Sequence, residues 1–233
     1  MDGVGSAIGE TFALLASGDA GLWRIVGLSM AVSGTATLVA AAVGLPAGAW
    51  IALSRFRGRG ACVAVLNAAM GLPPVVVGLL VYLLLSRSGP LGSLGLLFTA
   101  PAMVIAQALL VAPIVTALAR QTTEDAWAEY GEQLRSLNAT RAQAAATLLW
   151  DTRLTLATAV LAGFGRAAAE VGAVMIVGGN IDGATRTMTT AIALETSKGD
   201  LPLALALGAV LLAVVLAVNV AVQWLGRLAA RLG

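Results

Sequence analysis

Five long apolar stretches dominate the sequence and leave the chain few ways to fold. They occupy residues 25–53, 61–85, 96–119, 154–181 and 201–225. A helix needs about 20 apolar residues to cross a hydrocarbon core of roughly 30 Å. Because lipid offers no partner for exposed backbone N–H and C=O groups, each stretch is expected to be helical. The sequence therefore predicts an all-α integral membrane protein, with five transmembrane helices in a single domain over residues 1–233.

The composition supports this prediction and excludes several classes of protein. Of the 233 residues, 59% are hydrophobic and 11% are charged, whereas a soluble domain has about 25% charged residues. The net charge of +2 is too small to indicate a nucleic-acid partner. There is no histidine, and the single cysteine, Cys62, lies in an apolar stretch. We therefore expect no catalytic residue, no bound cofactor and no metal site in this chain, so it is not expected to be an enzyme.

Basic residues in the connections predict the orientation. Nine follow the first, third and fifth spans and four lie at the other ends, with Arg166 left out because it is inside a span. By the positive-inside rule, the N-terminus is outside and the C-terminus is in the cytoplasm. Residues 1–24 are then an outer segment. Its apolar residues Ile8, Phe12, Leu15 and Leu22 fit either a short amphipathic helix or a loosely ordered terminus.

Residues 120–153 form a charged connection that this orientation places in the cytoplasm. From 124 to 137 one helical face is apolar and the opposite face is polar. The first face holds Trp127, Tyr130, Leu134 and Leu137, and the second holds Asp125, Glu129, Glu132 and Ser136. Asn138 tolerates the left-handed conformation that ends a helix, and an alanine-rich helix over 140–150 is expected to follow. Two interpretations remain open: a helix lying on the headgroups, or one that docks on a cytoplasmic partner.

The fourth span contains two charged residues, Arg166 and Glu170, spaced to pair along one helix. An unpaired charge inside a bilayer costs several kcal/mol, so the two are expected to pair with each other. The pair is either structural, with bonds to a polar residue such as Gln107 or Thr116, or part of an anion path or gate.

Two further segments stand out in the sequence. Pro73 and Pro74 in tandem are expected to break the second span near its middle. Residues 182–200 are expected to form an outer loop and a short helix. Polar residues around this loop either contact an arriving anion or an external protein, or belong to an ordinary solvated loop and helix start; they include Asn180, Thr185, Arg186, Thr187, Thr189 and Thr190.

The charged connection resembles a motif in permease subunits of ABC importers. That motif reads Glu-Ala-Ala, three residues, Gly, nine residues, then Ile-x-Leu-Pro. Here the residues at the same spacing are Glu132-Gln133-Leu134, Asn138 and Leu148-Leu149-Trp150-Asp151. The proline pair, RAAAEVGAVMIVGGN and the segment that follows extend the resemblance over most of the chain. They are most similar to the permeases of tungstate importers, relatives of the molybdate permeases.

This resemblance implies the type I importer fold, a homodimer in a prokaryotic cytoplasmic membrane, and an external oxyanion-binding protein. It also implies that a separate ATPase subunit, in two copies, binds ATP and Mg, since the only lysine, Lys198, has no phosphate-binding loop before it. The ATPase-coupling residues would be Glu132, Gln133, Leu134, Leu137, Asn138, Ala139, Thr140 and Arg141. The alternatives are a molybdate or sulfate permease and, in another class, a secondary transporter or channel.

Overall fold

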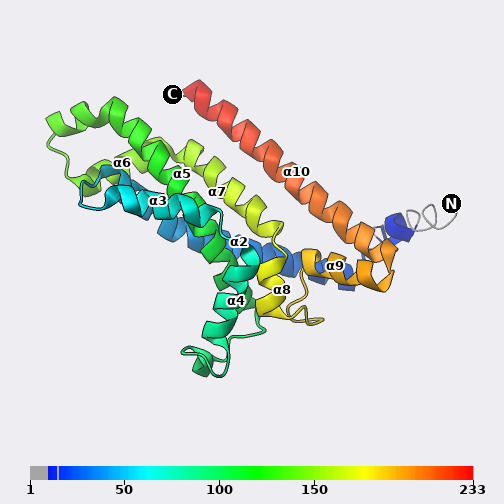
Figure 1. The fold of residues 1–233 in the computed structure, drawn as a ribbon. Helices are drawn as coiled ribbons and strands as arrows, with labels where there is room; N and C mark the ends of the chain where they lie inside the picture. Colours follow the sequence, from blue (N-terminus) through cyan, green and yellow to red (C-terminus); the bar gives the residue numbers. More distant parts are fainter. Residues whose placement is uncertain (1–9, 15, 233) are drawn as a thin grey trace. The chain divides into compact units, whose positions relative to one another are not determined.

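The computed structural model describes residues 10–14 and 16–232, which are helical apart from short connections and contain no strand. A short helical segment at 10–14 and 16–17 precedes the labelled helices (Figure 1). These are α2 (Ala20–Leu53), α3 (Arg59–Met70), α4 (Pro74–Leu85), η1 (Gly92–Leu94), α5 (Ala100–Ser136), α6 (Arg141–Asp151), α7 (Arg153–Ala168), α8 (Gly172–Gly178), α9 (Met188–Lys198) and α10 (Leu201–Leu232). The predicted all-α architecture is confirmed.

Three helices, α2, α5 and α10, are each long and apolar enough to cross a membrane. Two further crossings pass the same test only as interrupted pairs, α3 with α4 and α7 with α8. The described residues thus provide three candidate spans, or up to five if each pair makes one crossing.

The tandem proline divides the second predicted span. α3 ends at Met70, and α4 begins at Pro74 with Pro73 in an extended conformation before it. Proline has no N–H to donate and its ring clashes with the preceding turn, but the first turn of a helix accepts it. The structure places a helix break at this pair.

The fourth predicted span is also interrupted, although no proline is present. α7 ends at Ala168 and α8 begins at Gly172, so the expectation of helix throughout 154–181 is wrong at this point. The backbone groups at the break find other partners. The Ala167 carbonyl accepts hydrogen bonds from Gln107 Nε2 at 3.0 Å and from the Glu170 N–H at 3.1 Å. The Glu170 carbonyl accepts one from Thr189 Oγ1 at 2.8 Å, so side chains of α5 and α9 replace bonds that a continuous helix would make.

The chain falls into two compact units, each assembled from separate stretches of sequence. The first unit comprises the described residues up to Ala36 together with Pro73–Gln107 and Arg166–Ala217. The second unit comprises Thr37–Leu72, Ala108–Gly165 and the described residues from Val218 onward. Helices α2, α5, α7 and α10 contribute residues to both units.

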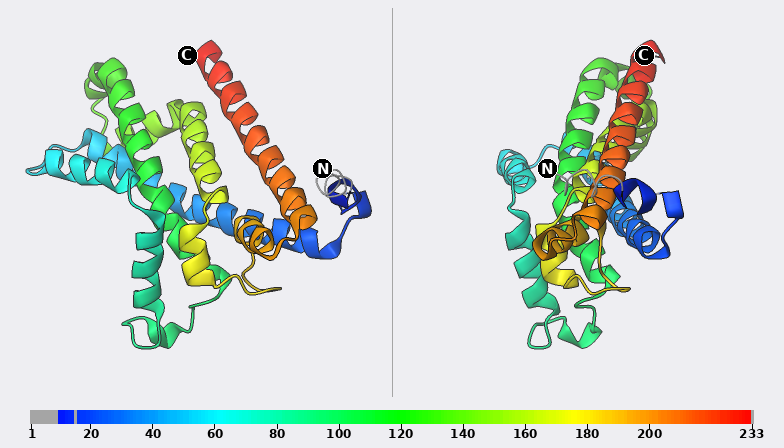
Figure 2. Two further views of the ribbon diagram at one scale, coloured as in Figure 1. Left: turned by 45° about the vertical axis from the view of Figure 1, so that its right-hand side comes forward. Right: turned by 90° about the vertical axis from the view of Figure 1, so that its right-hand side faces the viewer.

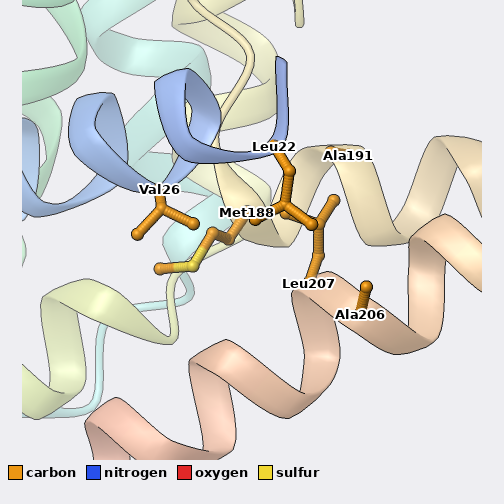
Figure 3. Packing of buried hydrophobic residues seen from close by; sticks show 6 residues of the cluster. All are labelled: Leu22, Val26, Met188, Ala191, Ala206 and Leu207. Carbon is orange, nitrogen blue, oxygen red and sulfur yellow. The ribbon is translucent and has the colours of Figure 1, made fainter. Parts of the chain in front are cut away.

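The first unit has an apolar core where α2, α9 and α10 meet. Figure 3 shows the side chains of this core packed against one another. It consists of Leu22 and Val26 from α2, Met188 and Ala191 from α9, and Ala206 and Leu207 from α10. At its edge the Met188 N–H donates to Ser29 Oγ at 2.7 Å, which satisfies one backbone group at the start of α9.

For the N-terminal segment, the sequence leaves open an amphipathic helix or a loosely ordered terminus. Two of its four apolar residues, Ile8 and Leu15, fall outside the described residues. Of the other two, Phe12 is exposed and Leu22 is buried in the core of the first unit. The two described positions therefore do not present one exposed apolar face.

Close helix packing in the first unit joins α4 to α8, which lie side by side in Figures 1 and 2. A Cβ atom on Gly78 would lie 2.7 Å from the Ala173 Cα, closer than real Cβ contacts. The absence of a side chain at Gly78 therefore allows the two backbones to approach, as small residues do between membrane helices.

The second unit has the same kind of contact between α2 and α5. A Cβ on Gly48 would lie 2.6 Å from the Thr116 carbonyl oxygen and 2.7 Å from the Ala119 Cβ. A larger residue at Gly48 would push α5 away from α2, because the atoms it meets are backbone or the first atom of a side chain.

Three charged residues tie the start of α3 to α5 in the second unit. Glu124 pairs with Arg59 through one carboxylate oxygen and with Arg120 Nη1 at 2.6 Å through the other. Arg59 Nε also donates to the Ile51 carbonyl at 3.0 Å, close to the end of α2. Two of the arginines counted toward the predicted orientation therefore also bind a carboxylate within the chain.

Candidate functional site

The motif residues lie in the second unit, at the turn between α5 and α6. The expected first helix of the charged connection is the C-terminal part of α5, which continues to Ser136. Asn138 has φ +54°. The Ala139 N–H donates to the Leu134 carbonyl at 3.0 Å, and the Asn138 N–H donates to the Arg135 carbonyl at 2.9 Å. These two bonds form a Schellman motif with Asn138 as its left-handed residue.

The left-handed backbone at Asn138 gives a local test. Asn138→Gly is expected to preserve or slightly raise the thermal stability, because glycine adopts this conformation without steric cost. Asn138→Val should lower the stability by about 1–2 kcal/mol, since a β-branched residue resists a positive φ. The fraction of protein that remains monodisperse after heating measures both effects. Equal stability of the two variants would contradict this account of the turn.

The second helix of the pair, α6, has its own start signal at Thr140, two residues after Asn138. Thr140 precedes α6, and its Oγ1 accepts a hydrogen bond from the Gln143 N–H at 3.3 Å. The Gln143 side chain in return accepts from the Thr140 N–H at 2.9 Å. This reciprocal capping box fixes the start of α6, so Arg141 is its first residue.

The apolar face predicted for the first helix is divided in the structure. Trp127, Tyr130 and Leu134 are half-buried, whereas Leu137 is 77% exposed. The guanidinium of Arg135 lies 5.2 Å from the centre of the Trp127 ring, where the ring attracts a cation. Of the four residues on this face, Leu137 is therefore the one that remains open to a partner.

The motif residues Glu132 and Gln133 are both exposed near the end of α5, five and four residues before Leu137. On the same helix, hydrogen bonding with Glu129 and its negative charge raise the pKa of Tyr130, and the charge of Asp151 adds a smaller effect. This end of α5 thus presents carboxylates beside a single exposed leucine.

In the first unit, Arg166 and Glu170 form the expected ion pair. Arg166 Nη1 lies 2.6 Å from Glu170 Oε2. Glu170 is not on the same helix as Arg166, because it lies in the break between α7 and α8. Its other oxygen, Oε1, accepts the Ala173 N–H at 3.1 Å, which satisfies a backbone donor in the first turn of α8.

The two charges differ in their surroundings. The Glu170 side chain is 4% exposed, and that of Arg166 is 38% exposed. The polar partners suggested for the pair are wrong: Gln107 bonds to the Ala167 carbonyl, and Thr116 Oγ1 bonds to the Ala112 carbonyl of its own helix at 2.7 Å. The Glu170 carboxylate is therefore bonded from both sides of the break, by Arg166 of α7 and by the Ala173 N–H of α8.

The polar residues proposed for an anion path make bonds within the first unit. Thr185 is buried, and its Oγ1 donates to the Gly178 carbonyl and accepts the Ile181 N–H at 2.9 Å. Thr187 is also buried and precedes α9, where it shares a capping box with Thr190. These two threonines stabilise the turn and the helix start.

Asn180 and Arg186 complete this loop. Asn180 has φ +50°, and its Nδ2 donates to the Thr190 carbonyl at 3.3 Å. Arg186 Nη1 lies 3.3 Å from Asp182 Oδ1 and 3.9 Å from Glu195 Oε1. Sequence reasoning missed Glu195, a buried carboxylate that also pairs with Lys198 at 3.0 Å. Its position on α9, one turn before Lys198, was the available signal.

Comparison with known proteins identifies the family. The family described as "Binding-protein-dependent transport system inner membrane component" matches residues 44–231, which cover most of both units. The chain belongs to this family. It is therefore a multi-pass inner-membrane protein and a transport component rather than an enzyme. Membership in this binding-protein-dependent family implies two further components, an ATPase and a binding protein.

Several members of the family are similar to the chain along most of its length. The tungstate uptake system permease protein TupB of Peptoclostridium acidaminophilum is 42% identical over 219 residues, which cover 94% of this chain and 96% of that protein. The probable anion ABC transporter permease protein of Haloferax volcanii is 40% identical, over 88% of this chain and 92% of its own. TupB of Campylobacter jejuni is 39% identical, over 66% of this chain and 65% of that protein. Permeases for molybdenum and sulfate are more distant.

Proposed function

We propose that this chain is the membrane-spanning permease subunit of an ATP-driven ABC importer that takes up tungstate. The observation that supports this most directly is the 42% identity to a tungstate uptake permease over 94% of the chain. The alignment spans almost the whole of both proteins, so it includes the motif turn as well as the helices of both units. The substrate would be delivered by an external oxyanion-binding protein.

The proposed topology has five spans, counting each interrupted pair as one. The N-terminus and residues 182–200 lie outside, the C-terminus lies in the cytoplasm, and residues 1–233 act as one permease domain. This orientation rests on the distribution of basic residues and on the proposed role of the motif turn. Two copies of the chain would form a homodimer that encloses the anion path.

The turn between α5 and α6 is proposed as the cytoplasmic coupling element. Its exposed residues Glu132, Gln133 and Leu137 would contact the ATPase, while Asn138 and Thr140 fix the geometry of the turn. A docking helix fits these residues better than a helix lying flat on headgroups, since only one apolar side chain of the four is open. ATP and Mg would bind to the ATPase, present in two copies.

For the ion pair, we propose a structural role. Glu170 is enclosed and bonded to Arg166 and to the start of α8, so little of its partner's charge is left for a passing dianion. The internal bonds of Asn180, Thr185, Arg186 and Thr187 favour the same kind of role over direct contact with the anion.

Uptake into vesicles tests the substrate. The permease, its ATPase and the cognate binding protein are reconstituted, and ATP-dependent uptake of tungstate, molybdate and sulfate is compared. We expect tungstate uptake to exceed the others at least about tenfold at equal low concentration, equivalent to about 1.4 kcal/mol of discrimination. Omission of the binding protein is the control. Equal uptake of all three anions would contradict the tungstate preference and leave the general oxyanion permease, as the more distant molybdenum and sulfate relatives suggest.

A further inference from the structure

Two grooves of opposite character meet at Arg153 in the second unit. One groove is apolar, with Leu156, Val160 and Leu161 of α7 along it and Leu45 and Leu225 beside them. Arg153 is the charged residue among the described residues that line it. The other groove is polar and is lined by Asp125, Glu129 and Asp151 together with the same arginine. The Arg153 guanidinium thus lines both the apolar groove and the polar groove that contains the three carboxylates.

Arg153 is held in place by its neighbour Trp150. Its Nη1 donates to the Trp150 carbonyl at 2.8 Å, and its Cζ lies 4.9 Å from the centre of the Trp150 ring. Trp150 is 71% exposed. Because a guanidinium has five N–H donors, the bond to Trp150 leaves others for a ligand. An exposed tryptophan beside an arginine, at the start of an apolar helix, is typical of the boundary between lipid and water.

The carboxylates of the polar groove limit which charges a ligand bound at Arg153 can carry. Asp125, Glu129 and Asp151 are all exposed, and the charges of the last two act together on the pKa of Tyr130. A ligand bound at Arg153 must therefore offer a negative group to the arginine and a positive group to the neighbouring acids. An anionic headgroup alone would meet three carboxylates against one guanidinium.

We propose that these grooves bind one phospholipid with a primary-ammonium zwitterionic headgroup, as in phosphatidylethanolamine. Its phosphate binds Arg153, its ammonium group donates to Asp151 and Glu129, and one acyl chain lies along α7 in the apolar groove. The nine residues from Arg153 to Leu161 span eight helical steps, a rise of about 12 Å, so the groove takes the upper part of an acyl chain. A quaternary ammonium headgroup cannot donate hydrogen bonds to the carboxylates and binds less well.

Lipid retention tests the site without reference to transport. The permease with its partner subunits is placed in vesicles of equal phosphatidylethanolamine, phosphatidylcholine and phosphatidylglycerol, purified in mild detergent, and the retained lipid is identified by native mass spectrometry. We expect about tenfold enrichment of phosphatidylethanolamine. Arg153→Gln should remove this enrichment, because the lipid phosphate would lose its charged hydrogen bond to the arginine. Arg57→Gln, which changes an exposed arginine of the same unit outside both grooves, is the matched control.

Two further variants separate the parts of the site. Asp151→Asn with Glu129→Gln should make the retention of phosphatidylethanolamine and phosphatidylcholine equal, because the ammonium partners are lost. Val160→Trp should reduce retention of every lipid by filling the groove, whereas Val65→Trp at an exposed position of α3 should not. Preference for phosphatidylglycerol, equal loss in the Arg153 and Arg57 variants, or no retained lipid would overturn the proposal. The last outcome would mean that a protein subunit covers the grooves.

Discussion

Glu132→Arg is expected to release the ATPase from the permease and to abolish ATP-driven uptake. Glu132 is exposed near the end of α5, in the turn proposed to dock on the ATPase. In the proposed docking, Glu132 pairs with a basic residue of the ATPase. Reversing its charge would replace this attraction with repulsion, and breaking a hydrogen-bonded charge pair at an interface costs about 2–5 kcal/mol. Affinity should therefore fall by at least about thirtyfold. Co-purification of the two subunits measures this loss.

Leu137→Asp should have the same effect for a different reason. Leu137 is the exposed apolar residue of the turn, and an aspartate there would place an unpaired charge in an apolar groove of the partner. Two variants outside the turn serve as controls: Glu10→Arg and Leu94→Asp, both at exposed positions of the first unit. If Glu132→Arg and Leu137→Asp still retain the ATPase and support uptake, the turn is not the coupling element.

Removing either half of the Arg166–Glu170 pair is expected to cause the largest loss of stability in the first unit. Breaking a fully buried pair costs about 3–5 kcal/mol, because the remaining charge has no partner. Since the Arg166 side chain is 38% exposed, we expect the lower end of this range. Arg166→Gln leaves a carboxylate that is 4% exposed. It should therefore lower the yield of assembled, monodisperse permease clearly.

The double variant Arg166→Gln with Glu170→Gln separates structure from transport. It restores electrical neutrality, and a glutamine at position 170 can still accept the Ala173 N–H. A structural pair predicts that assembly and uptake both recover in the double variant, so that the two substitutions are strongly non-additive. Recovered assembly with lost uptake, or with a changed order of preference among the oxyanions, would show that Arg166 acts on the anion.

The sequence predicted those features of the fold that depend on local chemistry. The apolar stretches became helices, α3 and α4 separate at Pro73 and Pro74, and Asn138 adopts a left-handed conformation. In each case the signal lies in the residues themselves, as hydrocarbon length, a missing N–H or tolerance of a positive φ. Such signals need no knowledge of neighbouring helices.

The features that were missed depend on residues far apart in the sequence. The break after Ala168 has no proline, and it is stabilised by Gln107 from α5 and Thr189 from α9. Glu124 pairs with Arg59, which is 65 residues away. A single sequence gives no sign of which distant polar groups meet, so the site residues were identified as positions but not as a network.

The turn between α5 and α6 also has a consequence for the order of assembly. The hydrogen bonds printed for the end of α5 and the start of α6 join residues between Gln133 and Ala144, so closing the turn requires no long loop to form. Synthesis proceeds from the N-terminus at about 5–20 residues per second. The 50 residues from Asp151 to Leu201 therefore take roughly 3–10 s. During that interval the turn can already be closed on the nascent chain, before the ribosome has begun the last helix.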